Sequence, residues 1–331
     1  MQEGRGIMSK PSSNMLIKNN TVINKDAMTK ECTDREEKTV AFSDIKRLLI
    51  YLALSFSLTF LWFFMTNPDG KNWEDMGQYR QSLVALGMLF PVISHVLTRV
   101  ITKEGFSFTG DESSYFGIFL NGGKWKYFLA ACLIPWFYTE LGSVIELILC
   151  PDRFDPEYYL SMGIEKRLLL LLPVNAIVTG IIISFAAFGE EGGWRGYMMP
   201  KLIRIMDRKK ALIVGGIIWG LWHAPLTCIG HNFGTDYPGF PYLGLLCMCI
   251  FCTLVGIILT FLTEKSGSVW PAAFMHAIGN ASPSILSGYI NPEKGNAAII
   301  HPGWIGMILA LLVVAVPVLL LWRKEKEPAV L

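Results

Sequence analysis

Charged residues are scarce in this chain. Asp, Glu, Lys and Arg make up 17% of its 331 residues, whereas 52% of the residues are hydrophobic. A soluble domain of this length usually carries about 25% charged residues. The shortage, together with several apolar runs of about 20 residues, predicts an all-α fold, a polytopic transmembrane helical bundle. A transmembrane β-barrel is excluded because its signature, alternating segments of about 10 residues, does not occur.

An excess of positive charge is also missing, since the formal net charge is only +2. Without a basic patch interleaved with aromatic residues, the sequence predicts the lipid bilayer as a partner and no nucleic acid. The N-terminal segment lacks the apolar region and cleavage site of a secretory signal peptide. The seven cysteines are scattered and odd in number, so they provide no disulfide framework. Cys247, Cys249 and Cys252 fall in one apolar run, where cysteine usually behaves as a small hydrophobic residue.

Several catalytic motifs are absent as well. The chain has no His-Glu-x-x-His, which excludes a zincin-type metalloprotease. It has no Gly-x-Ser-x-Gly nucleophile elbow, and Ser266-Gly267-Ser268 has no supporting context for one. It also lacks the phosphate-binding Gly-x-x-x-x-Gly-Lys-Ser/Thr of a membrane ATPase. Any hydrolytic chemistry must therefore use an activated water molecule rather than a recognisable side-chain nucleophile.

Eight apolar segments are predicted to cross the membrane as helices, and polar segments flank them. Residues 1–47 are predicted to be a flexible cytoplasmic tail with a short amphipathic helix near Lys38–Arg47, and residues 323–331 a second cytoplasmic tail. The transmembrane domain between them is 48–322. Its predicted spans are roughly Leu48–Met65, Ser82–Thr98, Lys126–Leu149, Leu168–Phe188, Ala211–Leu226, Tyr242–Thr263, Ser268–Leu286 and Trp304–Trp322.

Basic residues are distributed unequally between the connections. The connection 201–210 contains Lys201, Arg204, Arg208, Lys209 and Lys210, whereas 228–241 contains neither lysine nor arginine. Cytoplasmic connections of membrane proteins carry the excess of lysine and arginine. Both termini are therefore predicted to be cytoplasmic.

Three of the apolar segments carry pairs of polar side chains. Glu191 and Arg195 are four residues apart and would face each other on a helix, while Glu190 is rotated by about 100° from Glu191. Trp219 and His223 repeat the four-residue spacing, as do His276 and Asn280. Ionisable groups inside a membrane are costly, and they mark functional sites by default.

Hydrolysis is the chemistry that such groups suit. A carboxylate in a site with restricted access to water can act as a general base on a water molecule. An imidazole can hold that water, and a second imidazole and a carboxamide can donate hydrogen bonds to an oxyanion. Glu190, His223 and His276 could equally supply zinc ligands with an open fourth position for water. The spacing leaves the metal-dependent and the metal-free alternatives open.

In these residues the sequence resembles the CPBP family. The resemblance rests on Glu190-Glu191-x-x-x-Arg195, on an aromatic-x-x-x-His motif at Trp219–His223, and on His276-x-x-x-Asn280. The family joins type II CAAX prenyl proteases to bacteriocin-processing and immunity (Abi) proteins, and its members are often described as metalloproteases. The resemblance covers about residues 165–285. The aromatic position is commonly phenylalanine in the family and is tryptophan here.

The resemblance implies an eight-helix intramembrane endopeptidase that acts on a membrane-associated protein or peptide in a prokaryotic cell membrane. Glu190 would be the water-activating base and His223 its partner, His276 and Asn280 would form the oxyanion site, and Glu191, Arg195 and Trp219 would support them. A prenylated substrate is not implied, because the residues of the first motif resemble those of prokaryotic members more than those of the eukaryotic prenyl proteases. The sequence determines neither the cleavage position nor the oligomeric state.

Other polar residues are expected to lie outside the site. Glu140 and Glu146 are six residues apart and do not share a helix face. His95, His231 and His301 are interpreted as isolated histidines without a catalytic role. The alternative function is a non-catalytic membrane scaffold or bacteriocin-immunity protein that retains the fold. A transporter is disfavoured because the two halves show no internal repeat.

Overall fold

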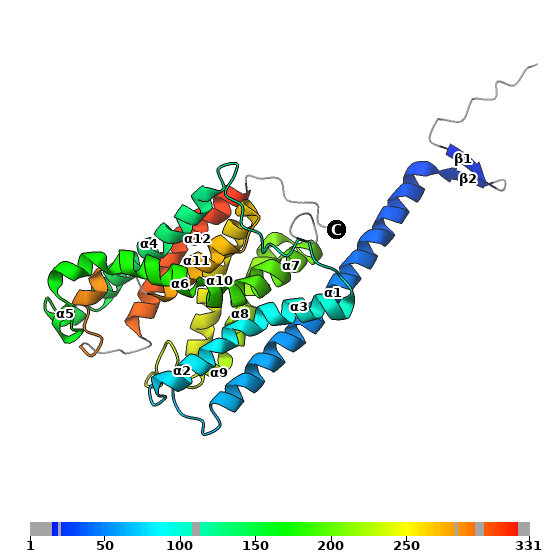
Figure 1. Cartoon of the computed structure of the whole chain (residues 1–331). Helices are drawn as coiled ribbons and strands as arrows, with labels where there is room; N and C mark the ends of the chain where they lie inside the picture. Colours follow the sequence, from blue (N-terminus) through cyan, green and yellow to red (C-terminus); the bar gives the residue numbers. More distant parts are fainter. Residues whose placement is uncertain (1–14, 19–20, 108–112, 282–283, 295–300, 324–331) are drawn as a thin grey trace, which may run out of the picture.

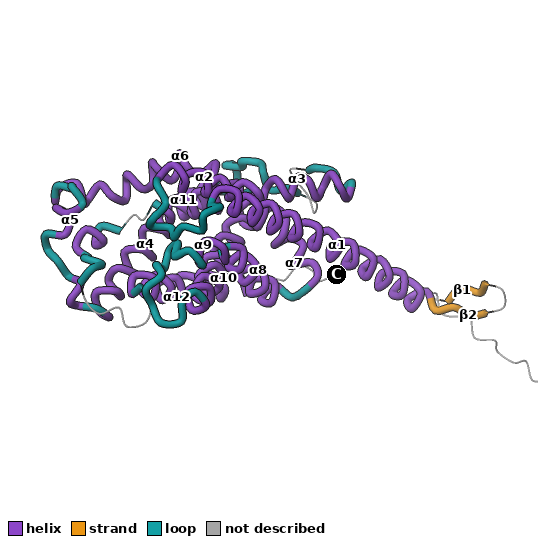
Figure 2. Tube along the Cα trace, turned by 90° about the horizontal axis from the view of Figure 1, so that it is seen from below, coloured by secondary structure: helices purple, strands orange, loops and turns teal. Residues whose placement is uncertain are grey.

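Helices dominate the computed structural model, which describes residues 15–18, 21–107, 113–281, 284–294 and 301–323 (Figure 1). A two-stranded antiparallel ribbon, in which Met15 lies opposite Asn24, precedes the first helix. Figure 2 shows that this ribbon and the start of the first helix project from a bundle made by the other helices. The predicted helical bundle is confirmed.

The elements are named in chain order. The strands are β1 (Met15–Lys18) and β2 (Thr21–Asn24). The longer helices are α1 (Lys25–Thr66), α2 (Gln78–Ala85), α3 (Phe90–Thr102), α4 (Trp125–Leu149), α6 (Leu172–Gly193), α8 (Arg208–Trp222), α10 (Tyr242–Ser266), α11 (Trp270–Asn280) and α12 (Pro302–Arg323). The shorter ones are α5 (Tyr158–Ser161), α7 (Met199–Ile205) and α9 (Ala224–Thr227). The 3₁₀ helices are η1 (Leu86–Leu89), η2 (Pro151–Arg153), η3 (Lys166–Leu171) and η5 (Leu286–Tyr289), and η4 (Trp194–Met198) is π-helical.

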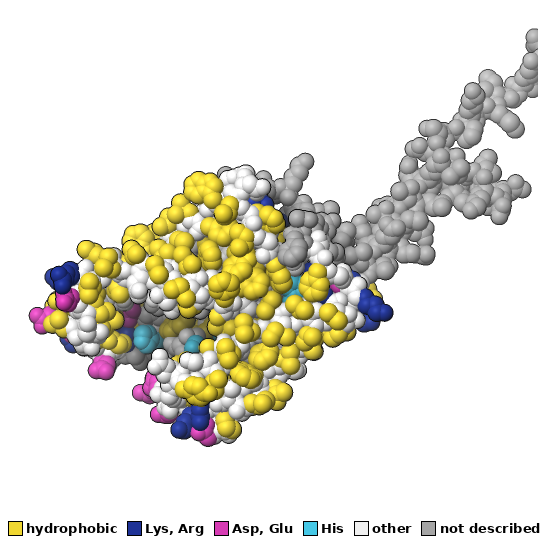
Figure 3. Space-filling model, in the orientation of Figure 1, with side chains coloured by type: hydrophobic (Ala, Val, Ile, Leu, Met, Phe, Trp, Pro, Cys, Tyr) yellow, Lys and Arg dark blue, Asp and Glu magenta, His cyan; other side chains and the backbone are white. Residues whose placement is uncertain are grey.

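Six helical segments within the described residues are long and apolar enough to cross a membrane. They are Ala41–Thr66, Gln78–Thr102, Trp125–Leu149, Lys166–Ile205, Tyr242–Ser266 and Pro302–Trp322. Large apolar side chains such as Ile182 (67% exposed) and Phe185 (70% exposed) point outward, and hydrophobic atoms cover most of the face shown in Figure 3. Such a surface suits lipid rather than water. The chain is an integral, multi-pass membrane protein.

The predicted fifth and seventh spans are shorter than predicted. They correspond to α8, with 15 residues, and α11, with 11 residues. At 1.5 Å per residue these helices are about 22 Å and 16 Å long, less than the roughly 30 Å of a hydrocarbon core. Sequence reasoning overestimated them because the apolar runs continue beyond the helix ends into α9 and the segment after Asn280. Both helices therefore end inside the bundle, where His223 of the second motif directly follows α8 and Asn280 of the third motif is the last residue of α11.

The first helix begins much earlier than the predicted first span, because α1 starts at Lys25. Asp44, which lies in the predicted flexible tail, is fully buried. Its carboxylate accepts hydrogen bonds from Arg204 Nε at 2.8 Å and from Lys201 Nζ at 3.3 Å, both on α7. Charged residues made this stretch look like a tail, but here they hold α1 against α7. The predicted boundary at residue 48 is therefore too late.

Glycines allow the helices that carry the polar motifs to pack closely. The main packed pairs are α6 with α11, α8 with α10, and α4 with α12. A Cβ atom built on Gly180 of α6 would lie 2.8 Å from the Cα of Ile278 on α11. A Cβ atom on Gly220 of α8 would lie 2.8 Å from the backbone nitrogen of Cys249 on α10. Larger residues at either position would push these helices apart.

The end of α6 widens into a π-helical turn, η4, before the chain continues as α7. His95 of α3 is buried beside this turn, with its Nδ1 atom 2.8 Å from the carbonyl oxygen of Gly192. Its other ring nitrogen, Nε2, accepts a hydrogen bond of 2.7 Å from Arg99 Nε. His95 is thus a satisfied interior histidine, as the sequence predicts, and it fixes the backbone directly after Glu190-Glu191.

Candidate active site

Glu190 connects the first motif to the second. It lies near the end of α6, is 2% exposed, and accepts a hydrogen bond of 2.7 Å at its Oε2 atom from the indole Nε1 of Trp219 on α8. Hydrogen bonds to an ionised acceptor are among the stronger ones in proteins. Trp219 therefore does more than line the cavity with an aromatic ring, because its indole N–H fixes one carboxylate oxygen of Glu190.

Glu191 faces the other way and connects the first motif to the third. Its carboxylate lies 3.1 Å from Arg195 Nη1, in the i, i+4 pair that the spacing predicts. Its Oε1 atom also lies 2.8 Å from Nδ1 of His276 on α11. The guanidinium of Arg195 stacks 4.1 Å from the centre of the Trp219 ring. These contacts join α6, α8 and α11 through one buried polar cluster.

His223 lies directly after the last residue of α8 and is oriented by the backbone of its own helix. Its Nδ1 atom lies 2.9 Å from the carbonyl oxygen of Trp219. The thiol sulfur of Cys252 on α10 lies 4.0 Å from the same nitrogen. The ring is packed edge-on against Trp222, with their centroids 4.9 Å apart. His223 is therefore held in one orientation by α8 and α10.

The partners of the two histidines set their hydrogen positions. A backbone carbonyl accepts hydrogen bonds only, so Nδ1 of His223 carries the hydrogen and its Nε2 atom is an acceptor in the neutral ring. An ionised carboxylate is also an acceptor only, so Nδ1 of His276 donates to Glu191. Nε2 of His276 can then donate as well only when the ring is an imidazolium, and the Glu191 carboxylate would stabilise that form. At its Nε2 atom, neutral His223 can therefore accept a hydrogen bond, whereas protonated His276 can donate one.

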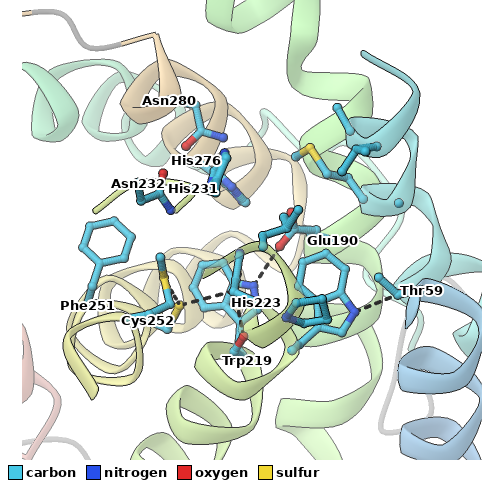
Figure 4. Close-up of a pocket in the computed structure, with 18 of the residues that line it drawn as sticks. Thr59, Glu190, Trp219, His223, His231, Asn232, Phe251, Cys252, His276 and Asn280 are labelled. Carbon is cyan, nitrogen blue, oxygen red and sulfur yellow. Dashed lines mark hydrogen bonds between the residues drawn. The ribbon is translucent and has the colours of Figure 1, made fainter. Parts of the chain in front are cut away.

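One cavity of about 380 Å³ brings the predicted catalytic residues together. Glu190, His223, His276 and Asn280 all line it, and Figure 4 shows them arranged around the same space. Of the supporting residues, Trp219 lines the cavity as well. Glu191 and Arg195 are not among the described residues that line it, and they lie behind His276 and Trp219. The remaining lining is mainly apolar and aromatic, with contributions from α1, η1, α10 and α12.

The cavity also contains two polar residues that sequence reasoning left out. His231 and Asn232, from the segment between α9 and α10, line it together with Trp73 from the connection between α1 and α2. The ring of His231 packs edge-on against that of Trp73, with a centroid distance of 4.3 Å. Burial, together with the nearby His223, lowers the pKa of His231 to about 4. The adjacent polar pair at the start of a loop was the available signal, but no periodicity linked it to the three motifs.

The other acidic residues of the third predicted span lie elsewhere. Glu140 accepts hydrogen bonds from the backbone N–H groups of Ile285, at 2.7 Å, and Leu286, at 3.3 Å. Glu146 forms a buried ion pair with Arg153 at 2.8 Å. Neither carboxylate is among the described residues that line the cavity. Glu140 instead restrains the segment that follows Asn280.

The potential metal ligands around the cavity are not grouped as a metal-binding cluster within the described residues. Within the described part of the chain, no group of three or more His, Cys, Asp or Glu side chains could hold a metal ion. Of the possible zinc ligands Glu190, His223 and His276, each directs one atom to a protein partner: Trp219 Nε1, the Trp219 carbonyl and Glu191 respectively. Partners of this kind also orient the histidines that bind zinc in metalloproteins.

Comparisons with known proteins support the resemblance on which the site was predicted. Residues 170–282 match the family described as type II CAAX prenyl endopeptidase Rce1-like. The chain is also 31% identical over 109 residues to the CAAX prenyl protease 2 of Methanococcus maripaludis, a match that covers 32% of this chain and 40% of that relative. The family match covers the part of the chain that carries the three motifs. Residues 170–282 are therefore similar to this Rce1-like family, as the motifs predict.

Proposed function

We propose that this protein is an intramembrane endopeptidase that hydrolyses a peptide bond in a membrane-associated protein or peptide. The observation that carries the proposal is that Glu190, His223, His276 and Asn280 line one cavity inside a helical membrane bundle. The family match, and a relative described as a CAAX prenyl protease, support the reaction class. The archaeal source of that relative supports a prokaryotic cell membrane as the location.

Glu190 would act as the general base. Trp219 holds its Oε2 atom at 2.7 Å, so the carboxylate has a fixed orientation at the cavity wall. It would remove a proton from a water molecule while the water oxygen attacks the carbonyl carbon of the substrate peptide. The Nε2 lone pair of neutral His223 would accept a hydrogen bond from the same water and position it.

His276 and Asn280 would stabilise the oxyanion of the tetrahedral intermediate. Both line the cavity and lie one helical turn apart on α11, so their side chains share a face. The Asn280 amide supplies N–H donors, and Nε2–H of a protonated His276 supplies another. Hydrogen-bond donors fixed where negative charge develops are usually the largest single contribution to such a reaction.

Collapse of the intermediate completes the reaction. The C–N bond breaks, and the proton held on Glu190 passes to the leaving amine, so that the carboxylate is restored. The products are a new carboxyl end and a new amino end. The hydroxyl of the attacking water ends in the new carboxyl group and its other proton on the new amine, so no further co-reactant is required. Glu191 and Arg195 would act as positioning residues, because they contact His276 and Trp219 rather than the space where a substrate would bind.

The experiment compares purified wild-type protein with Glu190→Gln in liposomes, using two peptide probes. One probe is a farnesylated peptide that ends in a CAAX sequence, as the relative's description suggests, and the other is a library of unprenylated apolar peptides read by mass spectrometry. Wild type is expected to cleave at least one probe, and Glu190→Gln is expected to lose the activity at unchanged melting temperature. Glu157→Gln, a change at an exposed residue, is the matched control.

A phenotype test separates the protease from the alternative, a non-catalytic scaffold or immunity protein. Glu190→Ala is introduced in cells in which the gene has a measurable phenotype, and the amount of folded protein in the membrane is checked. Loss of the phenotype is expected for a protease. If cells with Glu190→Ala show the wild-type phenotype while the variant protein is present at the wild-type level, the phenotype does not depend on proteolysis and the proposal is contradicted.

A further inference from the structure

A buried tyrosine on α4 shares the cavity with the proposed catalytic residues. Tyr138 is 3% exposed and lines the same cavity as Glu190, His276 and Asn280. It lies outside residues 170–282, the part of the chain that matches the Rce1-like family. Neither the three motifs nor the family match therefore assigns a role to Tyr138.

The hydroxyl group of Tyr138 lies against α11, beside the two proposed oxyanion donors. A Cβ atom built on Gly279 of α11 would collide with Tyr138 Oη. Gly279 follows His276 by three residues and directly precedes Asn280, so these three residues share one side of the helix. Gly279 also lines the cavity. Because residue 279 has no side chain, the phenol group can reach the helix between the two donors.

Within the described ranges, no residue forms a hydrogen bond with this hydroxyl group. A tyrosine hydroxyl can donate one hydrogen bond, and buried tyrosines usually find a partner for it. A buried polar group without a partner is costly in an apolar surrounding. The little surface that Tyr138 exposes lies at the cavity. The partner of its hydroxyl group must therefore come from what the cavity holds.

Contacts one turn further along α4 hold Tyr138 in place. Glu140 accepts a hydrogen bond of 2.7 Å from the backbone N–H of Ile285, and Ser143 Oγ lies 2.9 Å from Ser284 Oγ. Both contacts attach α4 to the segment that follows α11. The phenol group is thus carried by a helix that is fixed to the helix of the other donors. A donor that is already in position needs no rearrangement when charge develops on the substrate.

We propose that Tyr138 is a further catalytic residue, whose hydroxyl group donates a hydrogen bond to the carbonyl oxygen under attack and to the oxyanion that forms from it. The proposal rests on the proposed endopeptidase function and adds a third donor to His276 and Asn280. Nε2 of His276 donates only when the imidazole is protonated, whereas the phenol O–H is present in the neutral side chain. Tyr138 therefore supplies a donor that does not depend on the charge of His276.

Tyr138→Phe tests the proposal because it removes the hydroxyl group and keeps the ring. In liposomes, kcat for a cleaved peptide is expected to fall by about 10- to 100-fold, with little change in KM and in the melting temperature. Tyr237→Phe is the matched control: Tyr237 is also buried, and its hydroxyl group packs against Gly244 of α10, but it is not among the described residues that line the cavity. This control should keep the wild-type kcat. A wild-type kcat for Tyr138→Phe overturns the proposal.

A binding experiment tests the same donor without the reaction. One pool of capped apolar peptides carries a phosphinate in place of the central amide, which mimics the tetrahedral oxyanion, and a second pool consists of the matching amides. Both pools are incubated with Glu190→Gln and with the double variant Glu190→Gln/Tyr138→Phe, and the retained peptides are quantified by mass spectrometry. Loss of the phenol donor is expected to weaken retention of the phosphinates by about ten-fold and to leave that of the amides unchanged.

The two experiments separate failure of this proposal from failure of the proposed function. Equal retention of the phosphinates by both proteins, including no retention by either, overturns the role of Tyr138 as an oxyanion donor. If wild type cleaves no peptide but phosphinate retention still depends on Tyr138, the proposed protease function is refuted, whereas the phenol remains a donor to a tetrahedral anion in this cavity.

Discussion

The indole N–H of Trp219 donates a hydrogen bond of 2.7 Å to the carboxylate of Glu190, from a helix that lies 29 residues further along the chain. The same indole ring supports the guanidinium of Arg195 at 4.1 Å, while the backbone carbonyl of Trp219 orients His223. Trp219 therefore contacts the proposed base Glu190, the proposed water-binding residue His223 and the positioning residue Arg195. Its identity affects more than the shape of the cavity.

Trp219→Phe is expected to reduce activity without abolishing it. The change keeps an aromatic ring at the cavity wall but removes the N–H donor, which leaves Glu190 Oε2 buried without this partner. A hydrogen bond to a charged group contributes about 1.5–3 kcal/mol, so a decrease in kcat of roughly 10- to 100-fold follows. Steady-state kinetics on the peptide probe measure it. Unchanged kcat would show that the hydrogen bond has no part in catalysis.

Glu191→Gln tests the interaction between the Glu191 carboxylate and the His276 imidazole. The variant retains an acceptor for Nδ1 of His276 but removes the charge that stabilises an imidazolium with hydrogens on both nitrogens. Nε2 then lacks a hydrogen for the oxyanion, so kcat is expected to fall by about 10²-fold. KM should change little, because Glu191 is not among the described residues that line the cavity. A rise in KM at constant kcat would contradict this role, and Glu157→Gln serves as the surface control.

His276→Ala and Asn280→Ala test the oxyanion site itself. Each substitution removes one proposed donor and is expected to lower kcat by about 10²–10³-fold with a smaller effect on KM. The double variant should lose less than the product of the two single effects if the donors act on the same oxygen. Turnover at the wild-type level in both single variants would remove these residues from the mechanism.

Local sequence patterns predicted the helices and the three motifs because both depend on short-range spacing. The Glu191–Arg195 pair follows from the geometry of one helix, and it is present at 3.1 Å. The family match to residues 170–282 lies within the region predicted from these motifs, 165–285. What spacing could not give was contact between helices. The Glu191–His276 pair and the Trp219–Glu190 hydrogen bond join residues 85 and 29 positions apart.

Helix length and the loops were the weaker part of the prediction. Hydropathy does not register where a helix stops inside a bundle, so α8 and α11 were predicted as full spans although they end at Trp222 and Asn280. Asp44 was assigned to a polar tail because its buried partners on α7 lie more than 150 residues away. His231 had no periodic partner, and its place in the cavity depends on the connection 67–77, which folds against it.

Removal of metal ions is expected to leave activity and stability unchanged. Within the described residues, no three or more His, Cys, Asp or Glu side chains are grouped so that they could hold a metal ion. Protein dialysed against EDTA should therefore keep its kcat and melting temperature, and elemental analysis should find less than about 0.1 zinc per chain. Loss of activity with EDTA, restored by stoichiometric zinc, would contradict this prediction.

His231 is expected to make the protein less stable as the pH falls from about 6.5 to 4. Burial, with a contribution from His223, lowers the pKa of the folded-state imidazole to about 4, whereas the unfolded chain has a pKa near 6.5. Between these values the unfolded state binds a proton that the folded state does not, so the free energy of unfolding decreases with falling pH.

His231→Phe keeps an aromatic contact with Trp73 and cannot be protonated, so its melting temperature should fall less than that of wild type between pH 7 and 4.5. Tryptophan fluorescence in detergent can follow both proteins, with Asn232→Ala as a neighbouring variant that lacks a titratable change. Parallel decreases for wild type and His231→Phe would mean that His231 is already accessible to protons in the folded protein.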